Sequence, residues 1–146
     1  MFDTTRINVL DNSYDDERAA VTRTVHDIMA AARRRDTEAL EAFHAFGPKF
    51  TKFDDFEPLD RQDAETARRL EHDGVCGVKA FEAQAEDLKV DVFGPAAVAT
   101  FVLAYSVVTP EDEAMSFRAR TTMVFALHEG RWLIVHEHLS PFVGQG

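Results

Sequence analysis

The sequence predicts an α+β fold, in which helices come first and a run of antiparallel strands follows. Two observations indicate this. Apolar residues in the first half recur at the spacing of helices, and the second half consists of long apolar runs separated by short turn signals. Helices followed by a meander of strands are typical of α+β domains, where the helices cover one face of the sheet.

The first helix is expected to begin near residues 13–16, where a hydroxyl residue is followed three positions later by an acid. Residues 33–35, all arginine, end it near the negative pole of its dipole. Its apolar residues form one stripe: Val21, Val25, Ile28, Met29 and Ala32. Asp36 is expected to cap a second, shorter helix, which Gly47-Pro48 ends.

A short strand at residues 50–54 and a third helix at residues 60–72, ended by Gly74, are expected next. Turn residues then separate the predicted strands 82–93, 97–108, 115–128 and 132–140. The strand 97–108 is apolar on both of its faces, so both faces should be covered. Since helices cover only one face of such a sheet, a second subunit is expected on the other.

Length and charge limit the function. A chain of 146 residues predicts one domain, residues 1–146. Its formal charge of −10 argues against nucleic acid and anionic membranes as partners. Cys76 is the only cysteine, which excludes an internal disulfide. No apolar run approaches the roughly 20 residues of a membrane span, and the polar N-terminus lacks a signal-peptide core. A cytoplasmic location is therefore expected.

The last predicted strand becomes ionisable at its end. His136, Glu137 and His138 follow directly on Trp132-Leu133-Ile134-Val135. Successive side chains on a strand point to opposite faces, so the two histidines share one face and Glu137 points to the other. Titratable groups on an otherwise apolar strand need partners, water or a ligand.

These features resemble a known superfamily. The first helix, Phe53-Asp54, a glycine before a long apolar strand and the closing pattern Gly130-x-Trp132-x-x-x-His136-x-His138-x-Ser140 together resemble the nuclear-transport-factor-2-like superfamily. The chain is most similar to its SnoaL-like branch and to the association domain of calcium/calmodulin-dependent kinase II. The resemblance covers about residues 16–141, nearly the whole chain.

The resemblance implies a cone: a strongly curved, antiparallel or mixed sheet wrapped around N-terminal helices, of the cystatin-like kind, with a deep pocket. It also implies a homodimer formed through the outer sheet face. It implies no single activity, since the superfamily includes isomerases, dehydratases, polyketide cyclases and non-catalytic binding or assembly modules.

The resemblance also predicts the pocket wall. The kinase association domain lines its pocket with arginines, and the matching positions here are Leu103, Met123 and Leu139, which puts carboxylate binding of that kind in doubt. The residues expected to point inward are Phe101, Leu103, Tyr105, Met123, Phe125, Leu133, Val135 and Glu137, and Phe53 and Leu139 are added as pocket residues. A single β-bulge would exchange the two faces on one side of it.

The outward set is then Arg118, Arg120, Thr122, His136 and His138. The two arginines can clamp an anion or pair with the protein's own carboxylates. The two histidines can bind a metal if a neighbouring strand supplies a third ligand, or form a hydrogen-bonded interface pair. None of the other histidines is an obvious third ligand, so no metal is expected.

Three residues are candidates for chemistry. Glu137, if inward, is a carboxylate among apolar side chains, whose pKa desolvation would raise toward the range of a general acid or base; it can also pair with a cation or reach the pocket mouth. Asp54 lies where some isomerases of the superfamily hold their proton-shuttling aspartate, although with Asp55 it can form a solvated turn. Tyr105 can donate to a ligand oxygen or be a core residue with a satisfied hydroxyl.

Two functions remain open. The first is a cofactor-free isomerase, cyclase or dehydratase acting on an apolar carbonyl compound. The second is a non-catalytic module that dimerises and binds a small molecule or another protein. A homodimer is expected in either case, because the outer face is predicted to carry apolar residues: Val98, Val102, Val124, Trp132 and Ile134.

Overall fold

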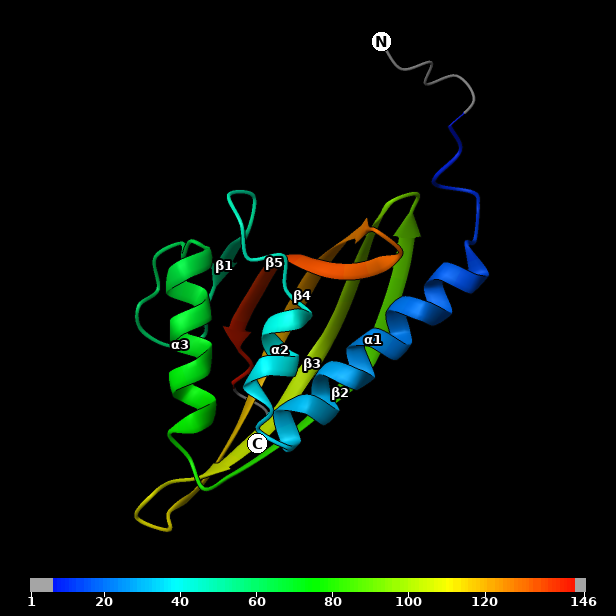
Figure 1. Cartoon of the computed structure of the whole chain (residues 1–146). Coiled ribbons are helices and arrows are strands. Elements are labelled where there is room, and N and C mark those ends of the chain that lie inside the picture. Colours follow the sequence, from blue (N-terminus) through cyan, green and yellow to red (C-terminus); the bar gives the residue numbers. More distant parts are fainter. Residues whose placement is uncertain (1–6, 144–146) are drawn as a thin grey trace.

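The computed structural model describes residues 7–143. Over this range the chain forms, in order, α1 (Asp15–Arg33), α2 (Thr37–Ala42), β1 (Thr51–Phe53), α3 (Ala64–Cys76), β2 (Ala80–Phe93), β3 (Ala96–Val108), β4 (Ala114–His128) and β5 (Arg131–Pro141) (Figure 1). The predicted order of helices and strands is confirmed. No helix within these residues is long and apolar enough to cross a membrane.

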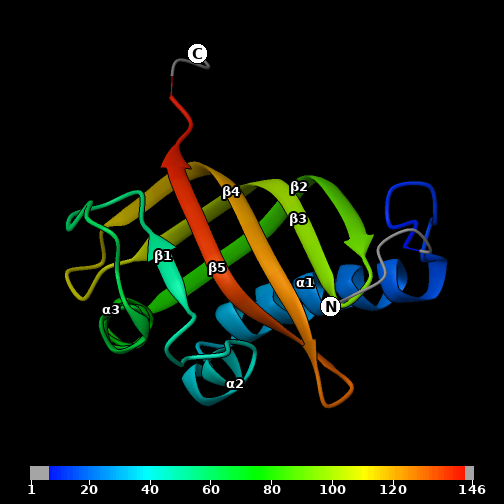
Figure 2. The same ribbon diagram turned by 90° about the horizontal axis from the view of Figure 1, so that it is seen from above.

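The strands form one mixed sheet in the order β1-β5-β4-β3-β2. Neighbouring strands from β2 to β5 are antiparallel, whereas the short β1 runs parallel to β5 and places Lys52 opposite Glu137. Figure 2 shows α1, α2 and α3 on the same side of the strongly curved sheet. The prediction of an α+β fold with a curved sheet wrapped around helices is thus confirmed.

The helices begin differently from one another. Asp36 and Asp63 cap α2 and α3, each accepting a hydrogen bond from a backbone N–H three residues on, at 3.0 and 2.9 Å. The expected hydroxyl cap of α1 is not formed: its N-cap is Tyr14 in the left-handed region, with no side-chain hydrogen bond. Helix α3 begins at Ala64 rather than at residue 60, because Asp63 is the residue that caps it.

A β-bulge in β5 decides which side chains point inward. Val124 of β4 pairs with His136, but the next residue, Phe125, pairs with Ile134, so Val135 is the extra residue. One extra residue reverses the alternation of faces along a strand. Trp132 and Ile134 are therefore buried before the bulge, and Glu137 is buried after it.

The bulge corrects two predictions. Leu133 and Val135, expected to point inward, are only half-buried. Trp132 and Ile134, expected on the outer face, belong to the core that α1 forms with the sheet. Glu137 does point inward, because it lies beyond the bulge.

Candidate functional site

A cavity of about 460 Å³ lies between the helices and the concave face of the sheet. Its wall is mostly apolar and includes five of the predicted pocket-wall residues: Leu103, Tyr105, Met123, Glu137 and Leu139. Phe101 and Phe125 are not on this wall, since they are buried in the core instead. The cavity lies within the range usual for small-molecule sites, about 300–1,000 Å³.

Phe53 was also predicted to line the pocket, and this is wrong. Lys52, its neighbour on β1, points into the cavity, so alternation turns Phe53 to the opposite face. There its ring lies 5.3 Å from the ring of His138 and 6.2 Å from that of His136, measured between centroids.

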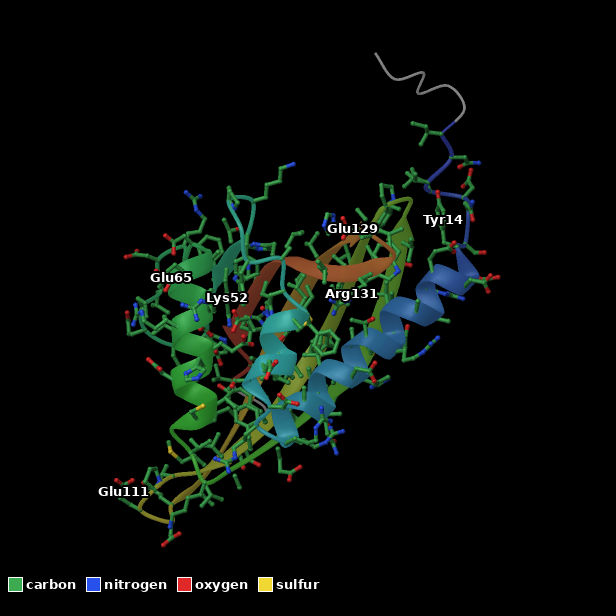
Figure 3. All side chains as sticks on the ribbon, in the orientation of Figure 1. Tyr14, Lys52, Glu65, Glu111, Glu129 and Arg131 are labelled. Carbon is green, nitrogen blue, oxygen red and sulfur yellow. The ribbon has the colours of Figure 1, made fainter. Side chains whose placement is uncertain are left out.

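The cavity wall carries more acidic groups than basic ones. One cation, Lys52, is accompanied by carboxyl groups from the segment after β1, from α3 and from β5: Asp54, Asp55, Glu57, Glu71 and Glu137. Lys52 lies on β1, the edge strand of the sheet that contacts α3 (Figure 3). Glu137, Asp54 and Tyr105, the predicted catalytic candidates, all lie on this wall.

Glu137 forms a buried ion pair with His44, which follows α2. His44 Nδ1 donates to the backbone oxygen of Leu40 at 2.7 Å, and its Nε2 donates to Glu137 Oε1 at 2.5 Å. Burial alone would lower the pKa of His44, but the carboxylates of Glu137 and Glu71 outweigh it and raise this pKa to about 9. His44 is therefore an imidazolium at neutral pH.

The raised pKa expected for Glu137 is wrong. Burial does oppose its ionisation, but Lys52 and His44 stabilise the carboxylate and lower its pKa to about 2. Glu137 instead pairs with cations, which was the alternative prediction for this residue. A carboxylate this firmly ionised is a weak base, so Glu137 holds Lys52 and His44 in place rather than moving protons.

Lys52 is held by several acids at once. Its Nζ lies 3.8 Å from Asp54 Oδ2, and Glu137 is its partner across the parallel pairing of β1 and β5. Burial would lower the pKa of Lys52, but Glu137, Asp54 and Glu71 together raise it above its ordinary value. Lys52 therefore keeps its charge, and Asp54 is ion-paired rather than part of a solvated turn.

Glu71 is a carboxyl on the wall with little support. Its Oε1 lies 3.8 Å from His44 Nε2, and among residues 7–143 it accepts no hydrogen bond. Burial raises the pKa of Glu71, even though His44 and Lys52 act in the opposite direction. A carboxyl with a raised pKa on an apolar wall suits a general acid or base.

Tyr105 and Asp55 form a second polar pair. The hydroxyl of Tyr105 donates to Asp55 Oδ2 at 2.9 Å. Burial and the neighbouring carboxyl of Asp54 raise the pKa of Asp55, and burial and Asp55 raise the pKa of the Tyr105 hydroxyl. Tyr105 is thus a fixed hydrogen-bonding group on the cavity wall.

A buried amide adjoins this cluster. Gln62 pairs with Lys52 in an isolated antiparallel bridge, so both side chains lie on the same face of the sheet. Gln62 is 3% exposed, and neither its amide oxygen nor its amide nitrogen has a hydrogen-bond partner within the described residues. Buried amides are rarely left unpaired, and ordered water is a common partner for them.

The other predicted polar residues lie outside the cavity. Arg118 pairs with Glu86 at 3.2 Å and stacks on Phe142, and Arg120 is exposed. His136 Nδ1 lies 2.9 Å from the hydroxyl of Thr51, and His138 is exposed. Within residues 7–143, no group of three or more His, Cys, Asp or Glu side chains is placed to hold a metal ion.

The model of the SnoaL-like domain matches residues 21–144. The chain belongs to the SnoaL-like family. Solved structures of similar fold include a proposed dehydratase of the NTF2-like family from Streptomyces avermitilis, at 16% identity, a TM-score of 0.79 and coverage of 89% of this chain and 99% of that one. No curated protein matches the chain.

Two further solved structures show how varied the proteins of this fold are. The association domain of C. elegans CaMKII has 19% identity and a TM-score of 0.70, covering 89% of this chain and 99% of that one. A proposed scytalone dehydratase from Novosphingobium aromaticivorans has 10% identity and a TM-score of 0.78, with 90% and 87% covered. At such low sequence identities, the similarity shows that the fold is shared and nothing more.

Sequence reasoning missed His44, Lys52, Glu71 and Asp55 as site residues. One signal for Glu71 was available: it stands seven residues after Ala64 and four after Ala67, on the apolar stripe of α3. An acid on such a stripe points toward the core, where it needs a function or a partner.

Proposed function

We propose that this SnoaL-like protein is a cofactor-independent acid–base enzyme, of the isomerase, cyclase or dehydratase type, acting on a small and mostly apolar carbonyl compound. The observation that carries the proposal is Glu71, a carboxyl of raised pKa without a hydrogen bond on the wall of an apolar cavity, beside the cations Lys52 and His44. The proposed dehydratases among the structures of similar fold support it.

In this mechanism Glu71 takes a proton from the carbon next to the substrate carbonyl. Negative charge then develops on the carbonyl oxygen, and the ammonium of Lys52 stabilises it. Tyr105, held by Asp55, orients the substrate from its place on the wall. Glu137 and His44 act as positioning residues, because Glu137 holds Lys52 and the imidazolium of His44 places a positive charge 3.8 Å from Glu71.

We expect Glu71→Gln to lower proton transfer by about 10²–10⁴-fold, the usual contribution of a general acid or base. The assay is deuterium incorporation from solvent at the α-carbon of small aromatic ketones, followed by NMR. Because Glu71 must be ionised to accept a proton, the wild-type rate should rise with pH through a midpoint above the ordinary value of 4.5.

His138→Gln is the matched control, since His138 is exposed on the other face of the sheet. It should exchange deuterium at the wild-type rate. Wild-type-like exchange by Glu71→Gln, or no exchange by the wild-type protein on any ketone of the panel, would contradict the proposed role of Glu71.

A second candidate, a non-catalytic module that dimerises, is favoured by the outer face of the sheet. No helix of the described chain covers this face (Figure 2). Val98 and Val124 lie directly opposite each other on it, and they and Val102 remain partly exposed. Apolar side chains on an uncovered sheet face are typical of an interface between subunits.

We expect sedimentation to show a homodimer at micromolar concentration, and Val124→Glu to shift it to a monomer. A charge at the centre of the proposed interface is buried without a partner in the dimer. Glu111→Gln, in the exposed loop between β3 and β4, should leave the dimer intact. A wild-type monomer would rule this interface out.

A further inference from the structure

The charges of the cavity are arranged for a positive ligand. Two cations, Lys52 on the wall and His44 behind Glu137, accompany the carboxyl groups of the wall. Glu137 and Asp54 are paired with these cations. Among the described residues, no cation lies within ion-pair distance of Asp55 or Glu57, and Glu71 has only the 3.8 Å approach of His44.

An aromatic surface adjoins Asp55. The rings of Phe81 and Tyr105 are stacked with centroids 6.0 Å apart, and those of Tyr105 and Phe117 with centroids 5.2 Å apart. Phe56 meets Phe117 edge-on at 5.2 Å. All four rings line the cavity, and the hydroxyl of Tyr105 holds the carboxyl of Asp55 at their edge. Aromatic faces beside a carboxylate attract ammonium groups.

Anions find little support in the same space. The wall residues within the described range include no arginine, and Leu103, Met123 and Leu139 are apolar. Among the described residues, Lys52 is the single basic side chain on it, and Asp54 and Glu137 offset part of its charge. An anionic ligand would meet the unmatched carboxyls, and like charges in a site of low dielectric constant repel strongly.

We propose that the cavity takes a small organic cation: a protonated amine on an apolar body, with its ammonium between Asp55 and the ring of Phe117. The hydrocarbon then lies against the apolar wall, and the reacting carbonyl lies near Lys52 and Glu71. The inference rests on the proposed function in that it concerns the same cavity, but it does not depend on proton transfer by Glu71.

The test compares three probes of one shape: 3-phenylpropylamine, 3-phenylpropan-1-ol and 3-phenylpropanoate. Calorimetry at about pH 7, where the amine is protonated, should show the amine binding about tenfold or more tightly than the alcohol, and the carboxylate not binding. Added salt should reduce the advantage of the amine and leave the alcohol unchanged.

Asp55→Asn should bring the amine close to the alcohol, and Phe117→Leu should weaken the amine more than the alcohol. Glu111→Gln is the matched control, because Glu111 lies in the loop at the far tip of the β3–β4 hairpin (Figure 3). If Asp55→Asn does not fold, two other measurements test the inference. These are the salt dependence of amine binding by the wild-type protein, and the ratio of amine to alcohol affinity in Phe117→Leu.

Equal affinity for amine and alcohol, tighter binding of the carboxylate, or no binding of any probe would overturn the inference. The inference would also be overturned if the ratio of amine to alcohol affinity were unchanged in both Asp55→Asn and Phe117→Leu. Selective amine binding without deuterium exchange would refute only the proposed enzyme. Deuterium exchange without amine selectivity would refute only the organic cation.

Discussion

Glu137→Gln is expected to destabilise the fold by about 3–5 kcal/mol, the loss usual when one partner of a buried ion pair is removed. Glu137 is 5% exposed, accepts the hydrogen bond of His44 at 2.5 Å and faces Lys52 across the parallel pairing of β1 and β5. The amide of glutamine can still accept one hydrogen bond. It cannot neutralise two buried cations, and this uncompensated charge is the main cost.

The loss should depend on pH in a defined window. The pKa of His44 is raised from 6.5 to about 9, so its contribution to stability is complete below pH 6.5 and is lost as pH rises through about 9. The pKa of Glu137 is lowered from 4.5 to about 2, so its contribution is present above pH 4.5 and is lost as pH falls through about 2. Wild type and variant should therefore differ most between pH 4.5 and 6.5.

Urea denaturation across this pH range measures the difference. The double variant Glu137→Gln, His44→Gln is the control, because each single variant already breaks the same pair and the two losses should not add. Fully additive losses, or a Glu137→Gln loss under about 1 kcal/mol at pH 5.5, would show that no buried ion pair contributes to stability.

The elements of the fold were predictable because their signals are local. The apolar stripe from Val21 to Ala32 fixed the face of α1, and Asp36 capped α2 as expected. Gly94 and Gly130 both adopt positive φ, at 70° and 78°, in the turns where they were placed. Strand bounds agreed within a few residues, since turn residues stand on both sides of each strand.

The inward face of β5 was only partly predictable. A bulge depends on how two strands pair, and no local signal at Val135 announces the extra residue. Strict alternation therefore placed Trp132 and Ile134 outside, although they are core residues. Glu137 was placed correctly because it lies on the far side of the bulge from them.

The charge state of the site could not be predicted from β5 alone. Desolvation predicts a raised pKa for a buried carboxyl, and only the partners reverse it. Those partners come from elsewhere in the chain: His44 follows α2, and Lys52 meets Glu137 only because β1 adds parallel to β5. Contacts between segments about ninety residues apart depend on tertiary structure, which spacing within one strand does not contain.

Trp132→Ala is expected to cost about 3–5 kcal/mol, the usual loss for removing a buried tryptophan. Trp132 is 8% exposed and packs in the core beside α1, where it borders a surface hollow with Ala20, Thr24 and Phe43. Leu127→Ala is the matched control, because Leu127 lies directly opposite on β4 but is 43% exposed. We expect Leu127→Ala to lower the free energy of unfolding by only about 0.5 kcal/mol.

The same variant separates the core from the interface. If Trp132 packs within one chain, its alanine variant loses the same free energy of unfolding at every protein concentration and leaves the oligomeric state unchanged. If it lay on the outer face, as strict alternation predicts, the variant would dissociate the proposed dimer and its loss of stability would grow on dilution. Denaturation at two protein concentrations therefore tests the bulge at Val135 itself, and with it the burial of Glu137 on the cavity side of the sheet.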